Sequence, residues 1–119
     1  MRRIDHEALV AAKARLDTLA LYPRPVRIER AWIVSVPWLF ALPWFRRFDG
    51  YTMWNLILLR SPALAADGDL VCHELCHVWQ MQHRPIGMPL SYALAYETNA
   101  YEQQARRATA GTVPVVPTG

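Results

Sequence analysis

Two histidines four residues apart, His73 and His77, enclose Glu74 in a segment whose composition favours a helix. An α-helix turns about 100° per residue, so residues four apart project from one face, one turn apart. The two imidazoles therefore meet only if the segment is helical, and both can then reach one Zn²⁺ ion at roughly 2.0–2.1 Å. Glu74 lies about 100° round the helix from His73, beside the metal, where it can take a proton from zinc-bound water. The H-E-x-x-H pattern thus predicts a zinc-binding helix.

A third protein ligand must come from outside this motif, because a catalytic zinc site normally has three protein ligands and one open position. Glu97 and Glu102 follow His77 in a segment predicted to be helical. They are five residues apart, so about 140° separates them around a helix, and only one can comfortably face the metal. His83 is a further option, although it ends the same helix as His77 and would have to bend back. The spacing leaves these three residues open.

The stretch from His73 to Gln80, HELCHVWQ, resembles the H-E-L-x-H-V-x-Q signature of small bacterial gluzincin-type metallopeptidase-like domains, which are minimal zincins. In those families a downstream glutamate, often within E-x-x-A, completes the zinc site. The tetrad 102–105, EQQA, fits that pattern. The resemblance covers about the last third of the chain and a preceding apolar strand. It implies Glu102 as third ligand, with Glu97 as the alternative, and a zinc-bound water that Glu74 activates to attack a peptide carbonyl.

Several other polar residues are candidates for supporting roles. Gln80 is seven residues after His73 and returns to nearly the same helix face, so it can hold a ligand or bound water in place. Three tyrosines can polarise a substrate carbonyl or form the wall of a groove: Tyr92, Tyr96 and Tyr101.

The remaining pattern predicts an α+β fold with a minimal zincin-like arrangement: an N-terminal helix, a small antiparallel sheet, the H-E-x-x-H helix and a C-terminal helix. An apolar stripe at helical spacing predicts a helix over 5–21, and period-two alternation predicts a half-buried strand over 26–36. A proline-punctuated aromatic loop over 36–45 and a turn at Asp49-Gly50 precede a buried strand over 51–59. Helices are expected over 69–83 and 90–109. One domain spans 1–111, and 112–119 form an extended or disordered tail.

Charge and hydropathy exclude several function classes. The net charge is +3 and the basic residues are scattered, which favours a solvated surface over a nucleic-acid interface. The apolar stretch 31–45 is broken by Pro37 and Pro43 and is too short for stable membrane insertion. The N-terminus has no secretory signal pattern, so a cytoplasmic location is expected.

Three functions fit this sequence. The first is a zinc-dependent metallopeptidase-like hydrolase acting on a peptide or protein substrate, which would add to the edge of strand 52–59 beside a wall formed by Trp38 and Trp44. The second is a zinc-binding interaction module without significant turnover, serving as a partner in a larger assembly. The third is a structural Cys/His zinc domain using Cys72 and Cys76, although buried thiols more often fill a core. A general base such as Glu74 has no purpose in the third.

Overall fold

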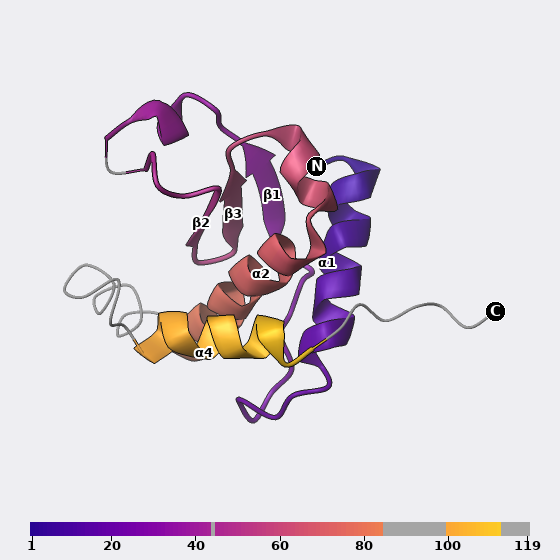
Figure 1. Cartoon of the computed structure of the whole chain (residues 1–119). Helices are drawn as coiled ribbons and strands as arrows, with labels where there is room; N and C mark the ends of the chain where they lie inside the picture. The colour runs from indigo at the N-terminus through magenta and orange to yellow at the C-terminus, as the bar shows by residue number, and fades with distance from the viewer. Residues whose placement is uncertain (44, 85–99, 113–119) are drawn as a thin grey trace.

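The described part of the chain has an α+β fold in which three helices pack around a small sheet. A computed structural model describes residues 1–43, 45–84 and 100–112 (Figure 1). The helices and strands in chain order are α1 (Arg3–Leu16), β1 (Trp32–Ser35), β2 (Gly50–Met53), β3 (Leu56–Leu59), α2 (Gly68–His83) and α4 (Ala100–Ala110). Two short 3₁₀ turns, Leu39–Ala41 and Pro62–Ala66, lie in the connections.

The sheet has three strands in the order β1-β3-β2 and is mixed. β2 and β3 form an antiparallel hairpin, whereas β1 pairs with β3 in parallel, with Trp32 opposite Leu56. The predicted antiparallel sheet is therefore only half correct. The parallel pairing could not be predicted from the local sequence pattern, because it joins segments more than twenty residues apart, whereas antiparallel neighbours need only a short turn.

The hairpin replaces the single strand predicted over 51–59. The chain reverses at Trp54, which has a φ of 51°, a left-handed conformation uncommon outside glycine, asparagine and aspartate. The Trp54 backbone N–H faces the Met81 sulfur of α2 at 2.8 Å. No glycine marks this turn, and Asn55 is its single turn-forming residue, so an almost wholly apolar segment gave only a weak signal that it folds back on itself.

The strand predicted over 26–36 is reduced to Trp32–Ser35, and its buried side is not the one that the alternation of Trp32 and Val34 predicts. Ile33 is buried, whereas Trp32 and Val34 are exposed on the other side. Farther upstream, the Arg27 backbone N–H and carbonyl both hydrogen-bond the Gln82 side chain of α2. A side chain thus takes the backbone groups that a strand partner would otherwise satisfy.

The helix boundaries follow local capping. α1 ends at Leu16, short of the predicted Leu21, and the Thr18 hydroxyl donates to the Arg15 carbonyl in its last turn. α2 begins at Gly68, where Asp67 accepts from the Leu70 N–H, close to the predicted start. α4 ends one residue past the helix predicted over 90–109, and the first part of that prediction lies outside the described residues.

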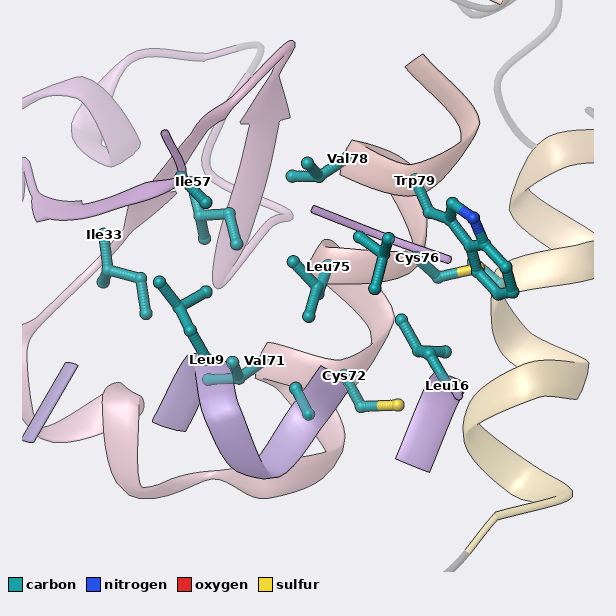
Figure 2. Close-up of a cluster of buried hydrophobic side chains, with 14 of the residues drawn as sticks. Leu9, Leu16, Ile33, Ile57, Val71, Cys72, Leu75, Cys76, Val78 and Trp79 are labelled. Carbon is teal, nitrogen blue, oxygen red and sulfur yellow. The ribbon is translucent and has the colours of Figure 1, made fainter. Parts of the chain in front are cut away.

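α2 forms the centre of the molecule, with the sheet on one side and α1 and α4 on others (Figure 1). The main core gathers side chains from α1, the sheet and α2, including Leu9, Ile57, Leu75 and Trp79 (Figure 2). A second apolar cluster contains Phe40, Phe48 and Leu58 and includes the aromatic connection before β2. None of the helices in the described ranges is both long and apolar enough to cross a membrane. This packing holds α2 between β2 and α4, which lie against the face of α2 that carries its polar side chains.

Candidate metal centre

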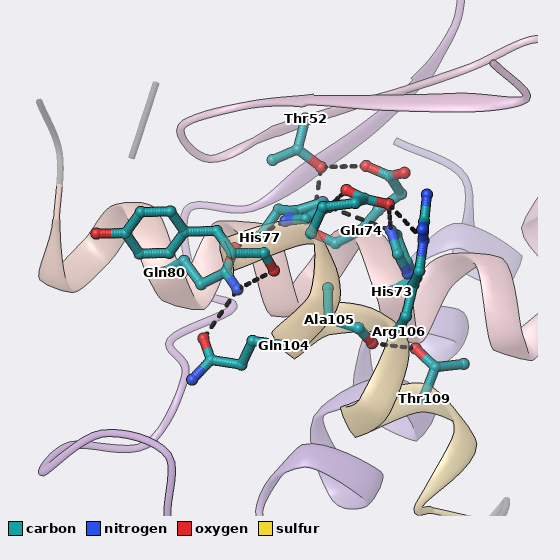
Figure 3. A network of polar contacts seen from close by, with 11 residues as sticks. Thr52, His73, Glu74, His77, Gln80, Gln104, Ala105, Arg106 and Thr109 are labelled. Atoms are coloured by element: carbon teal, nitrogen blue, oxygen red, sulfur yellow. Dashed lines mark hydrogen bonds and ion pairs between the residues drawn. The ribbon is translucent and has the colours of Figure 1, made fainter. Parts of the chain in front are cut away.

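Three side chains from two helices converge on one point between α2 and α4 (Figure 3). His73 Nε2 lies 2.8 Å from Glu102 Oε1, and His77 Nε2 lies 2.9 Å from Glu102 Oε2. The two imidazole Nε2 atoms are 3.2 Å apart. His77 and Glu102 are buried, and His73 is partly exposed. The three residues form a candidate metal-binding group within the described part of the chain.

A buried amide fixes which imidazole nitrogen of His77 faces this point. Gln80 Nε2 donates to the Tyr101 carbonyl at 2.8 Å and to Gln104 Oε1 at 2.9 Å. Gln80 Oε1, 2.8 Å from His77 Nδ1, is therefore an acceptor, and Nδ1 carries the proton. The Nε2 lone pair of neutral His77 then points toward His73 and Glu102. This is the orientation that metal-ligating histidines need.

The network of amide hydrogen bonds extends to Tyr22, in the segment that connects α1 to β1. The Tyr22 hydroxyl donates to Gln104 Oε1 at 2.9 Å. Gln104 thus accepts hydrogen bonds from both Gln80 and Tyr22, which ties α2 and α4 together beneath His77. The helix that carries Glu102 is held in register with the helix that carries the two histidines.

The electrostatics of the group favour a cation. Burial by itself lowers the pKa of His77, but the hydrogen bond to Glu102 and the negative charges of Glu74 and Glu102 outweigh it, so this pKa is raised above its ordinary value. A raised histidine pKa means that positive charge is stabilised at this position. The same field acts on a bound cation.

Glu74 is buried on the β2 side of α2 and is held apart from the three converging side chains. Thr52 Oγ1 of β2 lies 2.5 Å from Glu74 Oε2 and 3.1 Å from the Glu74 carbonyl. Gly50, two residues earlier, leaves room for the carboxylate: a Cβ there would lie 3.1 Å from Glu74 Cγ. β2 therefore fixes the rotamer of Glu74 from one side while α2 presents it.

An open pocket of about 430 Å³ adjoins the group. His73 and Glu74 line one part of it, Arg106 and Thr109 of α4 a second, and Arg47 and Phe48 of the loop before β2 a third. Of the three candidate ligands, His73 borders this space, so the group is accessible from outside on the His73 side, which a structural site would not need.

Several sequence predictions can be placed. Gln80 contacts His77 as expected, and Glu102 joins the two histidines. His83 does not: its ring stacks on Tyr22 at 4.7 Å and its Nδ1 faces the Trp79 carbonyl. Glu97, Tyr92, Tyr96 and Trp44 lie outside the described residues. Tyr101 contributes its backbone carbonyl to the amide network.

The two cysteines belong to the core. Cys72 and Cys76 are free thiols with no exposed surface, packed in the main apolar cluster (Figure 2). Burial raises the pKa of Cys72, and it raises that of Cys76 to about 12. Among the described residues, the groups of three potential ligands do not include either cysteine.

Sequence reasoning missed several residues around the group: Gly50, Thr52, Tyr22, Gln104 and Arg106. Arg106 had a usable signal, because it lies four residues after Glu102 on the same face of one helix, whereas Gln104, two residues after Glu102, does not share that face. The other three come from distant segments, and only the tertiary structure brings them to α2.

Comparisons with protein-family models, with curated proteins and with solved structures gave no match to this chain. The function must therefore be argued from the site itself.

Proposed function

We propose that this protein is a zinc-dependent, metallopeptidase-like hydrolase. The observation that carries the proposal is the convergence of His73, His77 and Glu102 beside a separately held Glu74. Two histidines and one glutamate are a known ligand set of catalytic zinc, with the fourth position left for water or substrate. A carboxylate that neighbours such a set without joining it has the position of a general base.

The spacing of the ligand atoms fits a tetrahedral zinc ion. Ligand atoms at 2.0–2.1 Å from zinc in a tetrahedron lie roughly 3.3 Å from one another. The two imidazole Nε2 atoms, 3.2 Å apart, already have nearly this separation. The Nε2–carboxylate distances of 2.8 and 2.9 Å need only a small outward adjustment. Nitrogen and carboxylate ligands without sulfur also suit iron(II), so metal analysis must measure both metals.

The protein's own groups would divide the chemistry between them. A bound zinc ion supplies Lewis acidity, which lowers the pKa of water toward about 7 and polarises a carbonyl. Glu74 accepts the proton at Oε1 while Thr52 holds Oε2, and it then delivers the proton to the leaving amine. Gln80 keeps the His77 ring oriented throughout.

A peptide can be held along the sheet edge nearest Glu74. β2 is an edge strand in the order β1-β3-β2, and its Thr52 contacts Glu74 directly. An extended substrate can add to this edge through main-chain hydrogen bonds. The edge proposed here is Gly50–Met53 alone, because β3 lies at the centre of the sheet. Trp38 is exposed but does not line the pocket beside Glu74. Phe48 does line it, so we assign to Phe48 the role of substrate-contacting wall that the sequence suggested for Trp38 and Trp44.

Metal content measured beside peptide turnover tests this function. We expect about one zinc per chain in wild type and in Glu74→Gln, and loss of zinc in His77→Ala and Glu102→Ala. Turnover of a peptide library should fall about 10²- to 10⁴-fold in Glu74→Gln, because removing a positioned general base costs that much.

The alternatives give different results in the same experiment. Zinc without any turnover that depends on Glu74 would favour an interaction module. Zinc retained in Glu102→Ala would point to Glu97 as third ligand. A wild-type protein that binds no zinc after reconstitution would refute the proposal.

A further inference from the structure

The pocket beside His73 and Glu74 has a distribution of charge that selects among substrates. Three aspartates line it, and each already has a partner within the protein. Asp49 pairs with Arg60 at 3.2 Å, Asp69 pairs with Arg15 at 2.9 Å, and Asp67 accepts the Leu70 N–H at the start of α2. The two ion pairs offset the charges of Asp49 and Asp69, whereas Asp67 keeps its charge and is held by a backbone N–H.

Arg106 contributes a guanidinium to the same pocket at the position closest to the metal ligands. It lies one helical turn after Glu102 in α4, and its Nε is 3.4 Å from Glu102 Oε1 (Figure 3). Its side chain is 58% exposed, so the group is open to a ligand. A guanidinium carries four further N–H donors on its Nη atoms, arranged as a fork that matches a carboxylate. One end can therefore face Glu102 while the other receives a substrate group.

A second guanidinium lines the pocket from the opposite element. Arg47 belongs to the loop before β2, where its guanidinium carbon lies 5.0 Å from the centre of the Phe48 ring. α4 and this loop thus bring positive charge to two walls of one space whose remaining wall holds His73 and Glu74. An anionic substrate group that reaches these guanidiniums gains charge-assisted hydrogen bonds.

We propose that this pocket binds a substrate carboxylate next to the bond that is cut, with Arg106 as its principal partner. The inference rests on the proposed hydrolase function and adds the substrate class: peptides with an acidic group beside the cleavage point. An aspartate or glutamate side chain and a free C-terminal carboxylate offer the same chemistry. The pocket's position next to Glu74 places either source within one or two residues of the reacting carbonyl.

A matched set of peptides tests the proposal. Four peptides of one sequence carry glutamate or glutamine beside the cleaved bond, each with a free or an amidated C-terminus. We expect wild type to favour a carboxylate over its amide by about tenfold in kcat/KM, and Arg106→Gln to bring that ratio close to one. In a fifth, amidated peptide with lysine at the same position, Arg106→Glu should raise kcat/KM above that of the glutamate peptide. Arg107→Gln, which removes the same charge from the neighbouring exposed position, is the matched control and should keep the wild-type ratio.

The pattern of loss distinguishes selection from catalysis. A fall in kcat/KM confined to the acidic peptides, carried by KM, supports carboxylate binding. An equal fall in kcat for acidic and neutral peptides would overturn it, since Arg106 would then serve the reaction itself. A preference for glutamate over glutamine in the amidated peptides identifies the side chain as the carboxylate that binds. A preference for the free over the amidated C-terminus identifies the terminal carboxylate instead.

Binding measured without turnover separates this inference from the proposed function. The probe is the amidated glutamate peptide, titrated by nuclear magnetic resonance into Glu74→Gln protein and into the same protein with Arg106→Gln. Binding to Glu74→Gln protein that needs both the glutamate and Arg106, together with no hydrolysis of any peptide by wild type, would refute the hydrolase and keep the carboxylate site. Hydrolysis that depends on Glu74 without any preference for carboxylate would keep the hydrolase and refute the site. Binding that ignores both the glutamate and Arg106 would also refute the site.

Discussion

At the scale of single residues, the candidate site depends on a close approach that only glycine permits. A Cβ at Gly50 would lie 3.1 Å from Glu74 Cγ and 3.3 Å from its Oε1, so the carboxylate must shift by a few tenths of an ångström in Gly50→Ala. Gly50 has no positive φ, and the constraint is therefore space and not backbone strain. We expect Gly50→Ala to lower kcat about ten- to a hundredfold, because small misplacements of a reacting group cost this much.

Zinc content and thermal stability identify the cause of that loss. Both should stay near wild type in Gly50→Ala, since the candidate metal ligands lie on α2 and α4 and alanine restricts the unfolded chain. Gly68→Ala is the matched control, because a Cβ there meets only Arg15 Nη1 at an ordinary 3.7 Å. Unchanged kcat in Gly50→Ala would mean that β2 does not position Glu74.

At the scale of elements, one buried arginine joins the three helices. Arg15 of α1 is 2% exposed and contacts Asp69 of α2 at 2.9 Å and the Thr109 carbonyl of α4 at 3.0 Å. It also reaches the carbonyl and hydroxyl of Thr112 just after α4. Because α4 carries Glu102, this arginine helps to hold the third candidate ligand against the two histidines.

Arg15→Met should therefore weaken both the fold and the metal site. We expect the free energy of unfolding to fall by about 2–4 kcal/mol, because two carbonyls and a carboxylate lose a buried charged donor. Zinc affinity should fall as well, measured by competition with a chelating dye. Lys13→Met on the same helix removes only a surface ion pair with Asp17 and should change stability by less than about 1 kcal/mol. Equal effects of the two variants would contradict this role for Arg15.

The elements also show what a sequence of this kind can predict. α2 was predicted to within one residue because its caps, its apolar face and the histidine spacing are all local. The same locality explains why Gln80 was found from its spacing. The sheet was not predictable: β1 and β3 pair in parallel across a long connection, and the hairpin turn at Trp54-Asn55 has no glycine and only Asn55 as a turn-forming residue. Thr52 and Gly50 were missed for the same reason, because their role depends on where β2 lies relative to α2.

At the scale of the whole molecule, the core and the site use opposite faces of one helix. α2 presents Val71, Cys72, Leu75 and Cys76 to the main core, and it directs His73, Glu74 and His77 toward β2 and α4. A helix with apolar residues on one face and ligands on another needs packing partners on every side. In a chain of 119 residues, the sheet, α1 and α4 provide them, so the helices that supply ligands also form the core.

This arrangement makes a prediction about the two thiols that separates the site from a structural Cys/His zinc domain. Cys72 and Cys76 are fully buried, burial raises the pKa of both, and that of Cys76 reaches about 12. A raised pKa lowers the fraction of reactive thiolate at pH 8, and burial blocks the reagent, so both effects act in the same direction. We expect no thiol to react with Ellman's reagent in the native protein, with or without a zinc chelator, and two to react after unfolding in guanidinium. Thiols that become reactive when the chelator removes zinc from a protein that stays folded would assign the metal to the cysteines. Continued protection would leave His73, His77 and Glu102 as the ligands to be tested.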